Sequence, residues 1–341
     1  MIKLLPVLSI KEDEPHLALV HWGWKVPALF SDKDYDNWNA GTGILDVSFL
    51  GAVFLKGKDR ADYLNRRCTN NVMDLKDGEH RRAFILSAVG KIEADFDVYQ
   101  DEANDRFLLI TAPYKADKLA AQIDQYIFTE DCSVEQLEDH IALAIRSGSP
   151  MLKNHDFTEL MADTDAFLFK SDVFGGATIC LLPHGSIEQA LEVIKTACFV
   201  SNPEFVGYNA FELHRIENGI TLFGADLTED TIPLEANLQR ALHNNKGCYP
   251  GQETIATITN LGRPSRQYLV FESSALISVG SSIIAEGVEN PVGCITSSTP
   301  HHNAPFYSIG YVKWRFRDGK FPLSVGNKKL MIHSEVEKRP E

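Results

Sequence analysis

The chain has 341 residues, which at roughly 100–200 residues per domain corresponds to two or three domains and excludes a single small module. Hydrophobic residues make up 44% of the chain and charged residues 23%, which is typical of a globular protein and not of a disordered one. The formal net charge of -14 argues against non-specific binding to nucleic acid or to an anionic membrane.

The cysteines and the N-terminus point to a reducing compartment. The six cysteines are scattered and form no C-x-x-C pair, so the sequence predicts neither a disulfide framework nor a metal site. The N-terminal stretch, MIKLLPVLSIKEDE, is a poor match to a signal peptide because its short apolar run is broken by Pro6 and then turns acidic. No apolar stretch approaches the ~20 residues that a membrane helix needs. We therefore expect a cytoplasmic protein with no membrane partner.

Strand and helix patterns alternate between Leu50 and Arg146. The stretches GAVFLKG, RRAFILSA, IEADFDVYQ and RFLLIT are predicted strands, and those that begin KDRADYL and PYKADKL are predicted helices. In IEADFDVYQ apolar and acidic residues alternate, so we expect Glu93, Asp95 and Asp97 on a polar face. The order of these elements predicts an antiparallel α+β unit.

A second α+β unit and a β-rich tail follow. Between Ala166 and His243, AFLFK and ATICLLP are predicted strands, and SIEQALEVIKTAC and NAFELHRIENG are predicted helices, the latter with Asn209 as N-cap and Gly219 as its stop. RQYLVFES, GSSIIAE, PVGCITSS, FYSIGYVKW, FPLSV and KKLMIHS predict a small sandwich or barrel. We expect domains at 1–146, 147–262 and 263–341. Whether each of the first two domains is formed by one continuous stretch of the chain stays open.

The most informative stretch is NNKGCYPGQET, which lies between the helical LEANLQRALH and the predicted strand ETIATITN. Two glycines and a proline force the chain to turn here, and Gly247 and Gly251 can take positive φ. Lys246 lies two residues before Cys248, and an ammonium near a thiol favours the reactive thiolate. On composition alone the alternative is a small buried cysteine in a tight turn.

Several blocks resemble a known superfamily. KGCYPGQE resembles the K-G-C-[FY]-x-G-Q-E signature of YgfZ-type folate-binding proteins, which include mitochondrial iron–sulfur cluster assembly factors, and GKIEADFDV resembles their G-K-x-x-A-D-x-x-V segment. RIENGITLFGADLTEDTIPLEANL is similar to both these proteins and the glycine-cleavage T protein, an aminomethyltransferase. HWGWKVPALF, GILDVSFLGAVFLKGKDRADYL and RCTNNVMDLKDGE are also T-protein-like, so the blocks cover most of residues 21–266.

The resemblance implies a T-protein-like ring of two α+β (ferredoxin-like) units with a C-terminal β-barrel and a central tetrahydrofolate site. It implies that Glu217 binds the pterin, because a carboxylate accepts paired hydrogen bonds from the 2-amino and ring N–H edge. Asp95 is placed beside the reactive nitrogen of the folate, where Ala94 replaces the second acid of T proteins. The other candidate folate-binding residues are Lys246, Tyr249, Gln252 and Arg263, with Lys246, Arg263 or Arg266 as cations for the glutamate tail.

Three functions stay open at this point. In the first, the protein binds tetrahydrofolate or a one-carbon derivative and supports iron–sulfur cluster assembly or repair, with Cys248 as the catalytic thiol and iron–sulfur proteins as clients. The alternative is a folate-dependent aminomethyltransferase or a related demethylase, which the single acid at Asp95 opposes. The third is an interaction scaffold with a degenerate pocket. His301 and His302 are interpreted as a surface turn, and Trp22, Trp24 and Trp38 as packing residues.

Overall fold

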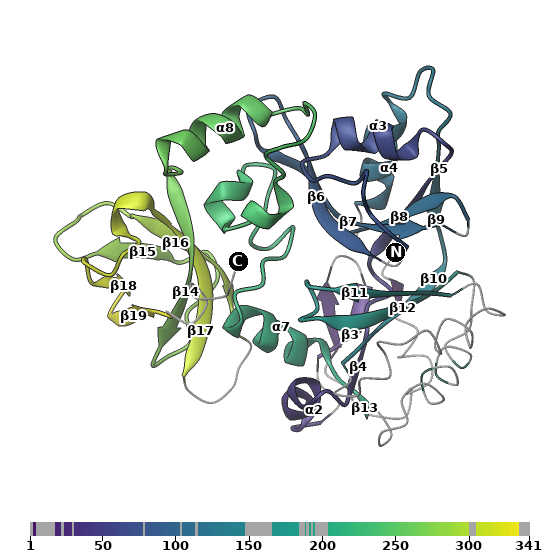
Figure 1. Cartoon of the computed structure of the whole chain (residues 1–341). Helices are drawn as coiled ribbons and strands as arrows, with labels where there is room; N and C mark the ends of the chain where they lie inside the picture. The colour runs from purple at the N-terminus through teal and green to yellow at the C-terminus, as the bar shows by residue number, and fades with distance from the viewer. Residues whose placement is uncertain are drawn as a thin grey trace. The chain divides into compact units, whose positions relative to one another are not determined.

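The structure is a computed structural model of the chain, shown in Figure 1. The residues that it describes are 3–4, 18–21, 24–28, 31–77, 79–102, 104–112, 115–146, 166–183, 188, 191, 194, 204–299 and 305–333. Most of the predicted helix SIEQALEVIKTAC lies outside the described residues, as do His301, His302 and Trp22.

The described residues form a mixed α+β fold with a closed β-barrel at the C-terminal end, which confirms the predicted fold class. One sheet has the order β6-β7-β8-β5-β9, formed by His80–Leu86, Ile92–Asp101, Arg106–Thr111, Gly51–Lys56 and Ser133–Leu137. A second has the order β11-β12-β10-β4-β13, formed by Phe167–Ser171, Ala177–Pro183, His140–Ile145, Gly43–Asp46 and Glu204–Phe205. A short sheet has the order β1-β3-β2, formed by Lys3–Leu4, Trp24–Pro27 and Ala18–His21.

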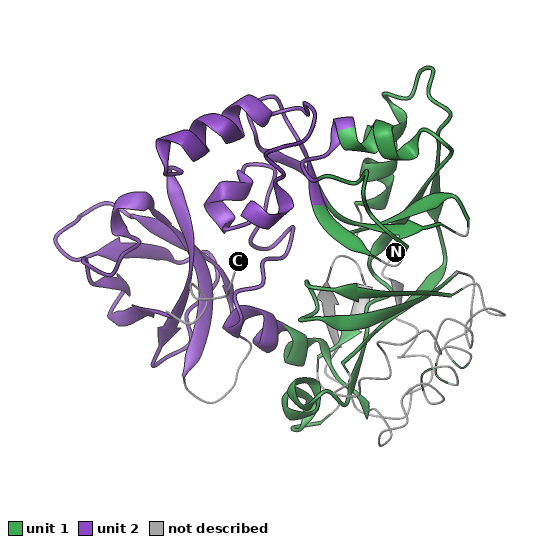
Figure 2. Ribbon diagram, viewed as in Figure 1, with its two compact units in different colours: residues 1–65, 71–82, 96–211 green, residues 66–70, 83–95, 212–341 purple. Residues whose placement is uncertain are grey.

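The chain divides into two compact units, coloured in Figure 2. Unit 1 consists of residues 1–65, 71–82 and 96–211, and unit 2 of residues 66–70, 83–95 and 212–341. Both units are discontinuous in sequence, because the chain passes between them several times. The three domain boundaries expected from the sequence stay a prediction.

Unit 1 is built around a large apolar core. Its helices are α2, Asp34–Ala40, most of α3, Arg60–Arg67, α4, Ala116–Asp124, and the first part of α7, Tyr208–Glu217. Trp38 is 0% exposed in the core, as expected for a packing residue, and Cys180 of β12 is equally buried. Burial of such side chains contributes roughly 25 cal/mol per Å² of apolar area, so this core stabilises the unit.

The alternating pattern of β7 is only partly retained. Ile92 and Ala94 are buried and Glu93 and Asp95 are half-buried, as the alternation predicts. Asp97 differs, because it is buried at 8% exposure and the Tyr99 hydroxyl approaches its carboxylate at 3.5 Å. The expectation of a polar face is therefore wrong at Asp97, because residues 96–100 of β7 are buried on both faces of the strand.

Unit 2 contains the barrel. Its strands close in the order β14-β17-β16-β15-β18-β19, formed by Arg266–Ser273, Phe306–Lys313, Gly293–Ser298, Ser282–Ala285, Leu323–Val325 and Lys328–Ile332. Phe271, Ile283 and Val312 are 0% exposed in its core. Short 3₁₀ turns η2, η3 and η4 occur at Pro233–Ala236, Gln239–Ala241 and Trp314–Phe316. Closure of the barrel pairs the edges that an open sheet would expose.

Two local predictions are wrong. The stretch predicted as the strand ETIATITN is the helix α8, Gln252–Leu261, in which Ile255 is buried. Its β-branched residues favour a strand by composition, but the hydroxyls of Thr257 and Thr259 donate to the carbonyls four residues earlier, at 2.8 Å each, which suits a helix.

The second error concerns the start of α7. Asn209 lies inside this helix and is not its N-cap. The preceding Gly207 N–H donates to the buried carboxylate of Asp34 at 2.6 Å, so a side chain from α2 fixes the start of α7. Gly219 does end the segment, with φ 65°.

Candidate functional site

The candidate catalytic and folate-binding residues all belong to unit 2. Asp95 is on β7, Glu217 is the last residue of α7, and Cys248 precedes α8. In Figure 1, α8 is at the top of the view and α7 lies below it, nearer the centre. Lys246, Cys248 and Tyr249 lie on the loop before α8 and Gln252 is the first residue of this helix, whereas Glu217 and Asp95 lie on other elements.

The thiol of Cys248 is exposed, which disfavours the alternative of a cysteine sealed in the core. It lies in the stretch 246–251, which we name the Cys248 loop. The neighbouring Tyr249 is buried at 7% exposure, and Gln252 begins α8. The loop therefore turns its aromatic ring inward and leaves the sulfur accessible.

Lys246 makes contacts that the sequence did not indicate. Its Nζ donates to the carbonyl oxygens of Cys68 at 2.7 Å and Asn70 at 2.6 Å, and lies 5.4 Å from the centre of the Tyr249 ring. Burial lowers the pKa of this ammonium, and the nearby Cys68 acts in the opposite direction. Burial also raises the pKa of the Cys68 thiol. Two of the three N–H donors of Lys246 are thus engaged by backbone carbonyls.

Gly251 is the position in the loop where only glycine fits. Its φ is 79°, and a Cβ at this position would lie 2.5 Å from the carbonyl oxygen of Ser87. Gly251 thus adopts the positive φ that the sequence allows at both glycines. Gly247 does not, since its φ is outside the left-handed region, and its Cβ position has open space around it.

Glu217 and Asp95 are both half-buried and take part in further interactions within the described part of the chain. Four residues after Glu217, the side-chain hydroxyl of Thr221 is buried and has no hydrogen-bond partner among the described residues. A buried hydroxyl without a partner costs free energy, so such a group is a natural point for a ligand to bind. Sequence reasoning overlooked Thr221, because nothing in its neighbours marks it.

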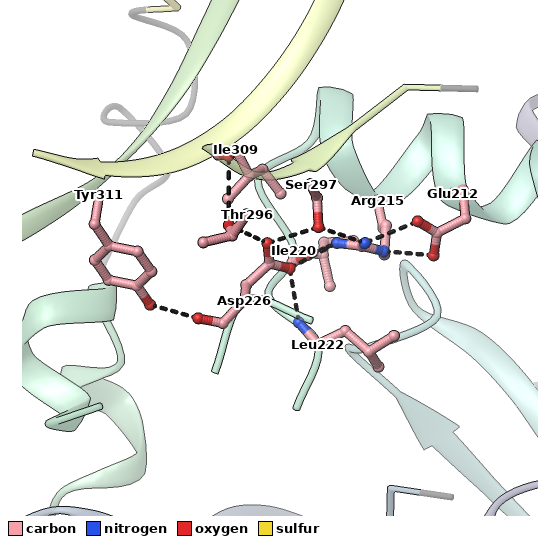
Figure 3. Close-up of polar contacts among 9 residues, drawn as sticks. All are labelled: Glu212, Arg215, Ile220, Leu222, Asp226, Thr296, Ser297, Ile309 and Tyr311. Atoms are coloured by element: carbon pink, nitrogen blue, oxygen red, sulfur yellow. Dashed lines mark hydrogen bonds and ion pairs between the residues drawn. The ribbon is translucent and has the colours of Figure 1, made fainter. Parts of the chain in front are cut away.

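A buried ion-pair network at the end of α7 was also overlooked (Figure 3). Arg215 is 2% exposed, and its Nε and Nη2 donate to Glu212 at 2.7 and 2.8 Å. Its Nη1 donates to Asp226 at 2.7 Å, and its Nη2 to Ser297 at 2.9 Å. The hydroxyls of Ser297 and Thr296 both donate to Asp226 Oδ1 at 2.7 Å.

This network joins α7 to the barrel within unit 2. Asp226 lies in the turn that follows α7, and Thr296 and Ser297 belong to β16. From β17, the Tyr311 hydroxyl donates to the Asp226 carbonyl at 3.0 Å (Figure 3). The spacing of Glu212 and Arg215 could have predicted their pairing on a helix, whereas the partners from the barrel are set by tertiary structure.

Arg266 forms a second ion pair, with Glu235. Its Nε donates to Glu235 at 2.9 Å, and its guanidinium lies 4.6 Å from the centre of the Tyr311 ring. Arg263 is exposed, and no hydrogen bond or ion pair joins it to another described residue. Of these two arginines, Arg263 is therefore the better candidate for a folate tail.

The described residues contain no group of three or more His, Cys, Asp or Glu side chains that could hold a metal ion. Among the same residues, no helix is long and apolar enough to cross a membrane.

Comparisons with known proteins agree with this architecture. Residues 17–148 match the GCVT N-terminal domain family. An aminomethyltransferase from Bacillus licheniformis is 27% identical over 75% of this chain and 76% of its own length. One from Bacillus velezensis is 23% identical over 100% of this chain and 98% of its own length.

A solved structure extends the likeness to three dimensions. The crystal structure of glycine cleavage system aminomethyltransferase T from Bartonella henselae has a TM-score of 0.84, 22% sequence identity and coverage of 98% of both chains. The chain has the T-protein fold. At this identity the likeness establishes the fold alone, and the YgfZ-type assignment within the superfamily stays a prediction.

Proposed function

We propose that this protein binds tetrahydrofolate or a one-carbon derivative through unit 2. The proposal is carried by the likeness to the T protein over 98% of both chains, together with Glu217 at the end of α7. The carboxylate of Glu217 suits the 2-amino and ring N–H edge of a pterin, and the unpartnered Thr221 hydroxyl offers a further polar contact. The residues present therefore fit a folate.

Aminomethyl transfer is the activity that the comparisons favour, since the relatives are aminomethyltransferases. In this reaction the protein holds the amine and the folate in contact, and a carboxylate assists proton transfer. Asp95 is the candidate for that carboxylate. Ala94 at the preceding position leaves one acid where T proteins have two, which argues for a slower reaction or a different acceptor.

Support of iron–sulfur cluster assembly or repair is a second candidate, favoured by one specific observation. The Cys248 thiol is exposed at the centre of a loop in which Gly251 fits against the 87–90 turn. An exposed thiol can meet a cluster or a client protein, which a buried thiol cannot.

Folate binding is tested by calorimetry with tetrahydrofolate. Loss of a charged hydrogen-bond partner costs about 1.5–3 kcal/mol, so Glu217→Gln should weaken binding on the order of tenfold to a hundredfold. Glu286→Gln, at an exposed position in the barrel, is the matched control and should bind as the wild type does. Absence of folate binding by the wild type would overturn the proposal and favour the scaffold interpretation.

The two activities are separated by two further experiments. Turnover with a lipoyl-carrier aminomethyl donor and tetrahydrofolate, lost in Asp95→Asn and retained in Glu93→Gln on the same strand, supports the transferase. Complementation of iron–sulfur enzyme activities in a null strain, lost in Cys248→Ala and retained in Cys294→Ala, supports the second candidate. Cys294 is the matched control because it is also exposed.

A further inference from the structure

Lys246 is placed unlike an ordinary surface lysine. A lysine side chain has about 2 kcal/mol of rotamer entropy and normally keeps its ammonium in water. Here the side chain is half-buried, and Nζ donates to two carbonyl oxygens at 2.7 and 2.6 Å. Neither acceptor is a side chain, so Lys246 connects its own loop to the backbone of a distant segment.

That segment, residues 68–70, is itself fixed. The Thr69 N–H donates to the Phe84 carbonyl on β6 at 2.9 Å, and the Phe84 N–H donates to the Thr69 hydroxyl at 2.9 Å. The Thr69 hydroxyl donates to the Ala241 carbonyl at 2.6 Å, and the Asn70 side chain donates to the Arg240 carbonyl at 3.1 Å. Residues 68–70 are therefore held by hydrogen bonds to β6 on one side and to residues 240–241, which precede the Cys248 loop, on the other.

The other end of the Cys248 loop is also held. At Gly251 the backbone lies so close to Ser87 that no side chain fits between them. Next to this contact, a Cβ at Gly90 would lie 3.0 Å from the Thr254 side chain on α8. The loop is thus fixed at Lys246 and at Gly251, and the exposed Cys248 lies between the two points.

We propose that Lys246 is a positioning residue, which fastens the Cys248 loop to residues 68–70 and so holds the thiol at one place on the surface. The importance of this role rests on the proposed function of the Cys248 thiol. The Lys246 ammonium also lies 5.4 Å from the centre of the ring of Tyr249, the residue that follows Cys248. In this interpretation Lys246 acts on the backbone of the loop, and is neither the cation that ionises Cys248 nor a ligand of the folate tail.

Hydrogen–deuterium exchange of the full-length protein tests the proposal. In Lys246→Met the amides of His243 and Gln252, which flank the loop and donate to the carbonyls of Thr69 at 3.0 Å and Tyr249 at 3.3 Å, should exchange on the order of tenfold faster, because the two charge-assisted hydrogen bonds of Lys246 are lost. Lys246→Arg retains donors and should restore much of the protection. Lys328→Met is the matched control, since Lys328 donates to the Leu276 carbonyl at 2.7 Å elsewhere in unit 2, and it should leave the loop unchanged.

Alkylation of Cys248 by iodoacetamide, followed by mass spectrometry with Cys294 as internal reference, gives the second measurement. The pH at which the Cys248 rate is half-maximal should be the same in wild type and Lys246→Met. Unchanged amide exchange in Lys246→Met would overturn the proposal. If this pH also shifted to higher values, Lys246 would act on Cys248 through its charge and not through the backbone of the loop. Neither readout uses folate or clusters, so failure of the proposed function would leave this result intact and distinguishable.

Discussion

Arg215 and Asp226 form an ion pair with 2.7 Å between Nη1 and Oδ2, and their side chains are only 2% and 0% exposed. The pair is supported by Glu212 on the helix and by Thr296 and Ser297 on the barrel. A carboxylate so deeply buried needs each of these partners, because desolvation of an unpaired charge is costly. The pair thereby fixes the end of α7, where Glu217 lies, against the barrel.

Removal of the guanidinium should strongly destabilise the protein. Arg215→Met leaves the buried Asp226 and the half-buried Glu212 without their cation, so we expect a loss of about 3–5 kcal/mol in the free energy of unfolding, measured in urea. Lys320→Met, which removes an exposed ion pair with Asp318, is the control and should change little. Similar unfolding curves for the two variants would contradict this account.

Three glycine substitutions separate steric clash from backbone strain in the Cys248 loop. Gly251→Ala should destabilise by more than ~1 kcal/mol, because it combines positive φ with a clash against Ser87. Gly262→Ala at the other end of α8 has φ 70° and open space, so it isolates the backbone cost. Gly247→Ala has neither problem and should be tolerated. The order of the three unfolding free energies checks the prediction, and equal losses in all three would be inconsistent with it.

Stability should fall at alkaline pH through Cys180. Burial raises the pKa of this thiol from 9.0 to about 12, so the folded state retains a proton that the unfolded state loses. The stabilisation is complete below pH 9 and is lost as the pH rises towards 12, with an upper limit of about 4 kcal/mol. Cys180→Ala should flatten the difference in unfolding free energy between pH 8 and pH 11, and Cys294→Ala should retain it. If Cys294→Ala flattened this difference and Cys180→Ala retained it, Cys180 would not be the group responsible for the loss of stability.

Arg263 and Arg266 should respond differently to the length of a folate tail. Arg266 is engaged by Glu235 and stacked on Tyr311, so Arg266→Met should lower stability and leave the ratio of mono- to triglutamyl tetrahydrofolate affinity unchanged. Arg263→Met should leave stability unchanged and raise this ratio towards one, because the variant loses the exposed guanidinium that can pair with tail carboxylates and so binds the triglutamyl form less tightly. Calorimetry with both ligands measures this ratio for each variant. If only Arg266→Met changed the ratio, Arg266 and not Arg263 would be the residue that binds the tail.

Local patterns were sufficient where a residue's environment follows from its neighbours in sequence. The six short β-rich stretches at the C-terminal end predicted a small sandwich or barrel, since strand-forming runs separated by turn residues are a local property of the sequence, and the structure has the barrel. The same reasoning failed for α8, where the preference of Ile and Thr for strands was overridden by tertiary packing, in which Ile255 is buried.

The sequence by itself determined the fold class, the candidate folate carboxylate Glu217 and the turn at the KGCYPGQE motif. Only the tertiary structure decided the partners of the charged side chains. Lys246 is two residues from Cys248 in sequence but donates to the carbonyls of Cys68 and Asn70, and Arg215 meets Asp226 and Ser297. A buried charge must be satisfied by whichever polar groups the fold brings within hydrogen-bond distance, and sequence separation does not specify which groups those are.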